Sequence, residues 1–456
     1  SQHRMRRMSR PPSLEPSLYR DHLALLQQGA EAALAATGHE ALVIASGIEK
    51  FAFLDDRPYG FQPNPHFKHW VPLNQHPHSW LAVRPGRKLR VVVHLPADFW
   101  HVPPSPPTGE WVEAVELVVI REPDEAVAAL KDVLGPRTAV IGEADAALPG
   151  LVPTNPEALL HRLHWARACK TPWELAQMRA ASRRAAPAHL AARDAFLAGA
   201  SEAEIHRAYL VASHHTDRDL PYANIVGLNE HAAVLHYQHQ DEARPLQSRS
   251  LLLDAGAQVN GYASDITRTW AAPGHAEFAG LITLMDHEQQ ALVAEVREGR
   301  DYRDIHLSSH QRLAPVLLES GLARPGTSAE ALVAQQVTHA FYPHGIGHLL
   351  GLQVHDIGGH MASELGGTRE KPAGHPYLRL TRTLAPGMVV TIEPGLYFIP
   401  MLLDRLRTSP AASLVDWATV ERLTPYGGIR IEDDVVCGSG AEAPENLTRE
   451  AFAACA

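Results

Sequence analysis

The segment LLLDAGAQVNGYASDITRTW, residues 251–270, constrains the fold most, because Asn260-Gly261 separates two runs of alternating residues. Asn-Gly is typical of a type I′ hairpin turn, in which both central residues need a positive φ. If residues 259 and 262 pair across this turn, partner numbers sum to 521, so Asp265 faces Gly256. Asp254 then lies two residues further along the same face, with diagonal Cα atoms roughly 7–8 Å apart. The segment predicts a hairpin that presents two carboxylates on one face.

Two uncompensated carboxylates at this separation repel each other. One or two divalent cations would remove the repulsion, because hard oxygen ligands suit such ions. A solvated hairpin face is the alternative that this segment alone leaves open.

A second cluster, FYPHGIGHLLGLQVHD at 341–356, contains His344, His348 and His355. Gly345 and Gly347 argue against a zincin-type helix, and no acidic residue stands where a dinucleotide loop would need one. A neutral imidazole in a rigid turn is a good metal ligand or proton carrier. A structural histidine is the alternative for each of the three.

Two further segments contain carboxylates among apolar residues. Glu393 lies in APGMVVTIEPGLYF at 385–398, where a buried carboxylate must be paired or metal-bound. In GGIRIEDDVV at 427–436, period-2 alternation predicts one strand with Arg430, Glu432 and Asp434 on the same face. An Arg–Glu surface pair is the alternative for the second segment.

Together these segments offer at least four carboxylates and one imidazole, a set that suits two divalent ions with a bridging hydroxide as nucleophile. Rival chemistries find little support, since the sequence has no GxSxG elbow, no P-loop and no supported cysteine nucleophile.

The chain length of 456 residues predicts two domains. Apolar runs at 41–46, 80–83, 89–96, 115–120 and 138–143 read as strands, and PDEAVAALKDVLG between the last two reads as a crossover helix. Thr171-Pro-Trp-Glu174 and Ser201-Glu-Ala-Glu204 read as capping boxes that open helices, and 277–299 as a third helix. We expect a disordered basic tail over 1–15, a mixed α/β domain over 16–165 and a catalytic domain over 166–456.

Composition restricts the partners. Lys and Arg number 41 against 51 Asp and Glu, and the net charge of −10 argues against a nucleic-acid surface. No run of 18 apolar residues suggests a membrane span. The same charge balance favours a small-molecule substrate. Three widely spaced cysteines, and a basic N-terminal segment that no apolar stretch follows, favour a cytoplasmic protein.

The order DAG…SDITRTW, PHGIGHLLGLQVHD, TIEPG and GIRIEDDVV resembles that of the dimetal "pita-bread" peptidases of family M24. FLDDRPYGFQPNPHFKHWVPL at 53–73, PYANIVGLNEHAAVLHY at 221–237 and YLRLTRTLAPGM at 377–388 look like the bacterial proline dipeptidases (prolidases) in particular. The resemblance covers nearly the whole chain. It implies an α/β (α+β) protein, with a mixed N-terminal domain followed by a pita-bread metallopeptidase domain.

The resemblance also implies roles for single residues. Two divalent ions, most commonly Mn²⁺ in this family, would be bound by Asp254, Asp265, His348, Glu393 and Glu432. Glu393 would also handle the proton of the attacking water. His236 and His355 would be catalytic, and Arg379 would bind the free carboxylate of a C-terminal proline. The remaining substrate-binding candidates are Arg430, His344 and Tyr222.

The activity that this resemblance implies is hydrolysis of Xaa-Pro dipeptides by a homodimer, with the hydroxide attacking the carbonyl before proline. Three alternatives stay open: an aminopeptidase P acting on longer peptides, an organophosphorus acid anhydrolase using the same site, and a metal-free binding protein.

Overall fold

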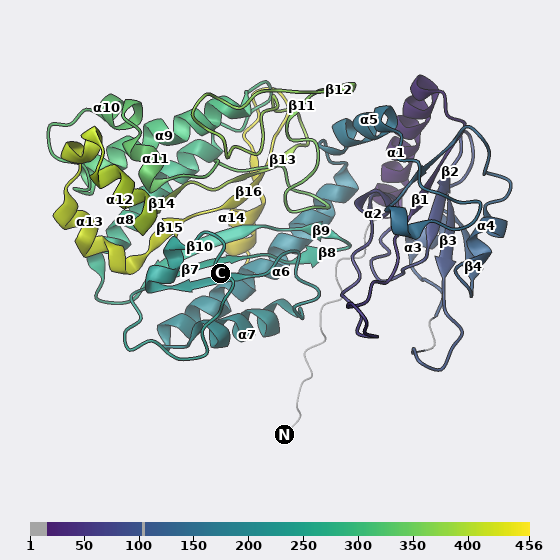
Figure 1. Ribbon diagram of the computed structural model, residues 1–456, viewed down its shortest axis with the longest axis horizontal. Coiled ribbons are helices and arrows are strands. Elements are labelled where there is room, and N and C mark those ends of the chain that lie inside the picture. The colour runs from purple at the N-terminus through teal and green to yellow at the C-terminus, as the bar shows by residue number, and fades with distance from the viewer. Residues whose placement is uncertain (1–15, 103–104) are drawn as a thin grey trace. The chain divides into compact units, whose positions relative to one another are not determined.

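The structure is a computed structural model that describes residues 16–102 and 105–456, and the predicted tail over 1–15 lies outside the described residues. Contacts divide the chain into two compact units, residues 1–180 and 181–456 (Figure 1). The predicted division at 165/166 lies N-terminal to this point. Helix α6 (Pro172–Leu197) runs through the dividing point and begins at the predicted capping box, in which Thr171 and Glu174 exchange hydrogen bonds of 3.1 and 3.3 Å.

The N-terminal unit is built on one five-stranded sheet in the order β4-β3-β2-β1-β5. Its strands are β1 (Ala41–Ala45), β2 (Trp80–Val83), β3 (Arg90–His94), β4 (Glu116–Ile120) and β5 (Thr138–Ile141). All five strands were predicted from the apolar runs. Alternate residues of β1 belong to different core clusters, Leu42 and Ile44 to one and Val43 to the other, so both faces of the sheet are buried.

Helices pack on both faces of this sheet. α1 (Pro16–Thr37) and α5 (Glu157–Arg167) contact each other and contribute to the cluster that contains Leu42 and Ile44. Short helices α2 (Pro65–Trp70) and α3 (Glu110–Glu113) flank the strands. The predicted crossover helix is much shorter than expected: α4 spans only Glu125–Ala129, and it connects strands at opposite edges of the sheet.

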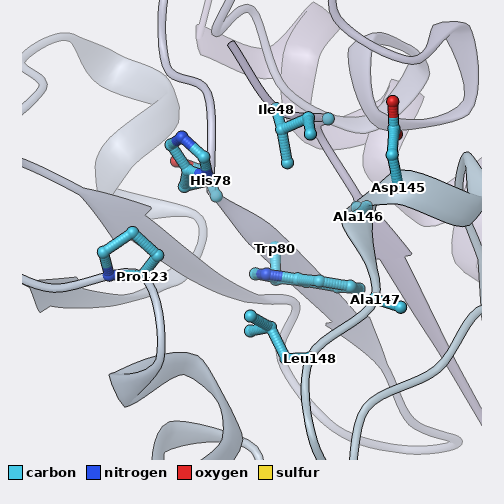
Figure 2. Close-up of a pocket in the computed structure, with 11 residues that line it drawn as sticks. Ile48, His78, Trp80, Pro123, Asp145, Ala146, Ala147 and Leu148 are labelled. Atoms are coloured by element: carbon cyan, nitrogen blue, oxygen red, sulfur yellow. The ribbon is translucent and has the colours of Figure 1, made fainter. Parts of the chain in front are cut away.

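A cavity of about 220 Å³ lies beyond the ends of β1 and β5. Figure 2 shows the indole of Trp80 at its centre, with Ile48 and Leu148 on either side. Asp145 at its edge already pairs with Lys50 at 3.3 Å. None of the predicted site residues lines this cavity, and its wall is mostly apolar.

The C-terminal unit is organised around the predicted hairpin. β7 (Ser250–Ala255) pairs antiparallel with β10 (Ile266–Ala271), and Val259 pairs with Tyr262 in the small ladder of β8 (Gln258–Val259) and β9 (Tyr262–Ala263). Every pair sums to 521, which confirms the predicted register. Asn260 and Gly261 both have positive φ, at 51° and 86°, as the predicted turn requires.

Helices enclose these strands (Figure 1). Leu251 and Leu253 of β7 pack in one cluster with α6 and α7 (Glu202–Ser213), which begins at the predicted capping box. Leu252 belongs to a different cluster with Ile225 of β6 (Ile225–Leu228), the third strand of this sheet, and with Tyr397. Because Asp254 follows the same alternation as Leu252, its side chain points away from α6 and α7.

The remaining strands of the unit form separate small sheets. β13 (Val389–Ile392) pairs with β16 (Asp433–Val436), which also pairs with β17 (Glu445–Asn446), and β14 (Gly395–Tyr397) pairs with β15 (Gly428–Arg430). β11 (Met361–Ser363) and β12 (Gly366–Thr368) form a separate hairpin. The predicted single strand over 427–436 is therefore wrong, because the chain changes partners at Ile431 and Glu432.

A large apolar cluster beside these strands draws on α8, α9, α11, α12 and α13. The helices of this region are α8 (Ala276–Val293), α9 (Tyr302–Glu319), α10 (Ala329–Ala334), α11 (Val337–Phe341), α12 (Pro400–Arg407), α13 (Trp417–Leu423) and α14 (Leu447–Ala453). α8 is the helix predicted over 277–299, and it ends earlier than expected. Within the described residues, no helix is long and apolar enough to cross a membrane.

Candidate metal centre

Four of the five predicted ligands converge in the C-terminal unit. Asp265, His348, Glu393 and Glu432 each offer one ligand atom, and these atoms all lie within 4.8 Å of one another. The Nε2 atom of His348 is 3.2 Å from Asp265, 3.6 Å from Glu393 and 3.9 Å from Glu432. The side chains come from four separate segments, namely the end of the hairpin, the glycine-rich turn, the β13–β14 connection and the β15–β16 connection.

Asp254, the fifth predicted ligand, lies next to this cluster, but both of its carboxylate oxygens accept hydrogen bonds from other side chains. One of its carboxylate oxygens accepts from the Tyr222 hydroxyl at 2.8 Å, and the other accepts from Arg430 at 2.9 Å. Burial and the negative charge of Asp265 raise the pKa of Asp254 to about 7. Tyr222 and Arg430, both predicted to bind substrate, therefore contact this carboxylate.

The turn that carries His348 is held by β13. The amide of His348 donates to the Thr391 hydroxyl at 3.0 Å, and the amide of Glu393 donates to the carbonyl of Ile346 at 2.8 Å. The His348 ring nitrogen Nδ1 lies 2.8 Å from the carbonyl of Leu349, to which a protonated Nδ1 donates. That hydrogen bond leaves the lone pair of Nε2 facing the carboxylates, which is the usual arrangement of a metal-binding histidine.

The carboxylates of this cluster are poorly satisfied by protein donors. Glu432 is buried and accepts from the Thr267 hydroxyl at 2.7 Å through one oxygen, but its Oε2 has no hydrogen-bond partner among the described residues. Burial, together with the charges of Asp265 and Glu393, raises the pKa of Glu432 well above its usual range. Although burial opposes ionisation of Asp265, its contact with His348 holds its pKa below the usual value.

The same negative charges act on His348 in the opposite sense, because they favour its charged form. Burial disfavours its charged form, yet the hydrogen bond to Asp265 and the charge of Glu393 raise its pKa to about 9. Without cations, the cluster would have to retain protons to balance its negative charge. Buried oxygens with no donor, surrounded by like charges, fit divalent cations.

Of the two predicted catalytic histidines, His355 lies beside the cluster. The ring of His355 is 4.5 Å from that of His348, and its side chain is exposed. Partial desolvation of its ring, together with the charges of His348 and Arg379, lowers the pKa of His355 to about 4. His236 follows the short helix η2 (Asn229–Ala233) in an exposed loop and lies close enough to His344 to lower the pKa of that ring.

His344, predicted to line the site, is connected to it through a tyrosine. Its Nε2 lies 2.7 Å from the Tyr397 hydroxyl, which accepts a hydrogen bond from Arg430 at 3.0 Å. Burial lowers the pKa of His344 to about 4. His344, Tyr397, Arg430, Asp254 and Tyr222 thus form one hydrogen-bonded chain beside the cluster.

Sequence reasoning missed residues that support the ligands. Asp434 accepts from the amide of Asp265 at 2.9 Å, and its other oxygen is buried with no partner in the described chain. The period-2 pattern of 427–436 could have identified Asp434, since Arg430, Glu432 and Asp434 all contact the hairpin despite the break between β15 and β16. Thr267 and Thr391 had no comparable signal, because buried threonines are common in strands.

A largely buried group of three carboxylates and one imidazole, in which one oxygen of Glu432 has no donor among the described residues, fits the metal site of a metal-dependent hydrolase. A family model described as Xaa-Pro dipeptidase, N-terminal domain, matches residues 17–165, and one described as metallopeptidase family M24 matches residues 176–439. The chain belongs to metallopeptidase family M24 and, within it, to the bacterial Xaa-Pro dipeptidases, the prolidases.

Individual relatives agree with this assignment. The chain is 50% identical over 438 residues to an Xaa-Pro dipeptidase of Stenotrophomonas maltophilia (strain K279a), covering 96% of this chain and 98% of the relative. It is 51% identical over 443 residues to an Xaa-Pro dipeptidase of Xanthomonas campestris pv. campestris (strain B100), covering 97% and 99%.

Solved structures support the fold. Aminopeptidase P from E. coli with the inhibitor Pro-Leu has a TM-score of 0.70 and 22% identity, over 97% of this chain and 98% of that one. The Pseudomonas aeruginosa aminopeptidase PepP has the same TM-score and identity, over 97% and 99%. The C-terminal unit therefore has the predicted pita-bread fold, preceded by the predicted mixed α/β domain.

Proposed function

We propose that this chain hydrolyses Xaa-Pro dipeptides to a free amino acid and proline. The observation that carries the proposal is the buried cluster of Asp265, His348, Glu393 and Glu432 in a chain half identical to proteins named Xaa-Pro dipeptidase.

Two divalent ions fit the residues of this site. Asp265, His348, Glu393 and Glu432 would hold them, and Asp254 would join the set by exchanging its contacts with Tyr222 or Arg430. Mn²⁺ is the expected ion because the family resemblance implies it, and the oxygen-rich donor set with one imidazole is compatible with this choice. When bound, the ions would supply an activated water near neutral pH and would polarise the scissile carbonyl.

Protons are handled by residues around the cluster. Glu393 is half-buried beside His348 and can accept a proton from the attacking water. Proline leaves as a secondary amine and must be protonated, so a nearby donor accelerates the reaction. We assign hydrogen bonding to the scissile carbonyl and proton delivery to His355, whose ring lies 4.5 Å from that of His348, and to His236, as the family resemblance implies.

Substrate orientation is assigned to the cationic edge of the site. The exposed Arg379 would bind the carboxylate of the C-terminal proline through its planar guanidinium. His344, Arg430 and Tyr222 would line the remaining wall as members of the hydrogen-bonded chain in which Asp254 accepts from both Arg430 and Tyr222. A clamp for the terminal carboxylate favours dipeptides over longer peptides.

The experiment is release of leucine from Leu-Pro and from Leu-Pro-Pro, because cleavage before the first proline frees leucine from either peptide, using chelator-stripped protein with and without Mn²⁺. We expect Mn²⁺ to restore cleavage of Leu-Pro and to leave Leu-Pro-Pro intact. Cleavage of the tripeptide would shift the assignment to an aminopeptidase P activity. Absence of cleavage with Mn²⁺, Co²⁺ and Zn²⁺ alike would end the peptidase proposal.

The carboxylate clamp has its own test. Arg379→Ala should raise the KM for Leu-Pro about 10- to 100-fold, because a charged hydrogen-bonding partner is lost. Arg405→Ala, which removes another exposed arginine of the same unit on α12, should leave KM unchanged. An unaltered KM in Arg379→Ala would remove this residue from the substrate site.

We further propose a cytoplasmic homodimer. The N-terminal unit exposes large apolar side chains on the segment 51–59, with Phe53 at 89% and Leu54 at 90% of their maximum exposure. Exposed apolar patches of this kind mark protein interfaces. Three cysteines in 456 residues suit a reducing compartment. Sedimentation of the purified chain and of a Phe53→Asp variant tests the dimer, which the variant should weaken.

A further inference from the structure

His306 on α9 connects two segments that belong to different parts of the proposed site. Its Nδ1 accepts a hydrogen bond from the amide of Ile346 at 3.2 Å, and its Nε2 lies 2.8 Å from Nδ1 of His375. The ring is almost completely buried, with 2% exposure. Ile346 lies between His344 and His348 in the ligand turn, and His375 lies in the segment that leads to Arg379.

The proton positions on this ring follow from its partners. Burial and neighbouring imidazoles lower the pKa of His306 to about 3, so the ring is neutral and has a single N–H. Because Nδ1 accepts from an amide, that proton must be on Nε2. The Nε2–H group then donates to Nδ1 of His375, so His306 is one link in a directed chain from Ile346 to His375.

The same rings could suggest a metal ion, since ligand atoms of His306, His310 and His375 lie within 4.8 Å of one another. His306 and His310 are four residues apart on one helix, a spacing found in zinc sites. The proton on Nε2 of His306 argues against an ion, because a protonated nitrogen has no lone pair to donate. A hydrogen-bonded bridge accounts for the contacts of His306.

The two bridged segments also touch directly. A Cβ atom on Gly345 would lie 2.9 Å from the Cα of Leu378 and 3.1 Å from the carbonyl oxygen of Tyr377. Such distances exclude any side chain at 345, so the ligand turn and the Arg379 segment pack backbone against backbone. α9 contributes a second residue to this arrangement, Tyr302, whose hydroxyl donates to the carbonyl of Thr391 at 2.7 Å.

We propose that His306 is a positioning residue that sets the ligand turn and the carboxylate-binding segment at a fixed spacing. One nitrogen holds the peptide between His344 and His348, and the other holds the segment that ends at Arg379. The role of Arg379 in this statement rests on the proposed dipeptidase function. The hold on the ligand turn does not depend on it and concerns metal affinity alone.

Two substitutions separate the two hydrogen bonds. In His306→Asn the side-chain oxygen takes the position of Nδ1 and keeps the Ile346 bond, while the His375 bond is lost. In His306→Gln the longer amide reaches the position of Nε2 and keeps the His375 bond, while the Ile346 bond is lost. His310→Asn is the matched control, since it replaces an equally buried histidine one turn away and keeps the contact of Nδ1 with Thr338, 2.9 Å long.

The readouts are the dissociation constant for Mn²⁺ and the KM for Leu-Pro. We expect His306→Asn to keep Mn²⁺ affinity within about 3-fold and to raise KM about 10-fold, as for one lost hydrogen bond. His306→Gln should weaken Mn²⁺ binding about 10-fold and leave KM, measured at saturating Mn²⁺, nearly unchanged. His310→Asn should alter neither quantity more than 3-fold.

Three results would overturn the proposal. The two His306 variants could change both quantities equally, His310→Asn could match them, or His375→Ala could lose a third equivalent of bound metal. If the wild-type chain failed to release proline from Leu-Pro, the dipeptidase function would fail. The Mn²⁺ affinities of His306→Gln and His306→Asn would still decide the role of His306 in the ligand turn.

Discussion

Two groups of ligand-type side chains in the C-terminal unit are equally compact and opposite in physical character. Asp265, His348, Glu393 and Glu432 form one group, and His306, His310 and His375 form the other, with ligand atoms within 4.8 Å in each. In the first group, charges of one sign are concentrated, and an oxygen of Glu432 has no donor among the described residues. In the second group, neutral rings hydrogen-bond to each other and to the chain.

The contrast shows that residue type and spacing do not identify a metal site. The carboxylates of the first group repel one another, as the raised pKa of Glu432 indicates, and bound cations would relieve this repulsion. The histidine group has no such repulsion between charges, since burial lowers the pKa of His310 to about 2 and keeps its ring neutral. Unsatisfied acceptors and like charge are therefore the features that distinguish the proposed metal centre.

A buried glutamate elsewhere in the unit sharpens the contrast. Glu202 at the start of α7 is as buried as Glu432, with 1% exposure for each. Its two oxygens accept from the amides of Leu228 and Asp241, the Tyr237 hydroxyl and the His231 ring, at 2.7–2.9 Å. The compact set Glu202, His231 and Asp241 is thus another group of ligand-type residues that protein hydrogen bonds already satisfy.

The largest expected effect comes from Glu432→Gln. Loss of one ligand charge should reduce kcat/KM for Leu-Pro by at least about 10³-fold, because the metal-dependent activation of water is lost. In chelator-stripped protein the same substitution should raise the free energy of unfolding by about 1 kcal/mol or more, since it removes a buried, repelled carboxylate. Urea unfolding with chelator present measures the second effect.

Glu202→Gln is the matched control for that stabilisation. It removes a carboxylate of the same burial that four donors satisfy, so it should lower the free energy of unfolding by about 1–3 kcal/mol, with or without metal. If both glutamine variants shifted the stripped protein in the same direction, the distinction between repelled and satisfied carboxylates would be wrong.

Metal removal is the next effect in size. With free Mn²⁺ at about 1,000 times its dissociation constant, binding should add about 4 kcal/mol to the free energy of unfolding, and chelator should remove it. His375→Ala should leave this difference unchanged, because the histidine group takes no part in it. Calorimetry of wild type and variant across a Mn²⁺ titration measures both values. A smaller metal-dependent gain in His375→Ala would mean that the two groups are not independent.

The sequence predicted the local parts of this comparison well. Asn260-Gly261 determined the hairpin register, because a two-residue turn allows one pairing only. The motifs that surround Asp265, His348, Glu393 and Glu432 identified four residues that the fold brings together. The five strands of the N-terminal sheet followed from their apolar runs.

Features that depend on long-range partners escaped prediction. The break between β15 and β16 occurs because residues 428–430 pair with β14 while 433–436 pair with β13, and periodicity contains no information on partner choice. The contact of His306 with Ile346 spans 40 residues of sequence, and that of His306 with His375 spans 69. α4 stopped short of its predicted end because helix propensity is weak evidence against tertiary packing.

The smallest effect is a pair of opposite pH dependences. His306 and His310 have folded pKa values of about 3 and 2 against 6.5 unfolded, so the unfolded chain binds more protons below pH 6.5. Their contribution to stability is present above pH 6.5 and is lost as the pH falls. His310→Asn should therefore reduce the loss in the free energy of unfolding between pH 6.5 and 5 by about 1 kcal/mol, with metal bound or removed.

The carboxylate group should act on the alkaline side, and only after metal is removed. His348 has a folded pKa of about 9 against 6.5 unfolded, so its stabilisation is complete below pH 6.5 and is lost as the pH rises through 9. Chelator-stripped protein should lose about 2 kcal/mol between pH 7 and 9, and saturating Mn²⁺ should abolish that loss because the cation replaces the proton. Urea unfolding across this pH range measures the loss of stability directly. If this loss of stability persisted at saturating Mn²⁺, His348 would keep its proton in the metal-loaded enzyme. That result is incompatible with its proposed role as a ligand.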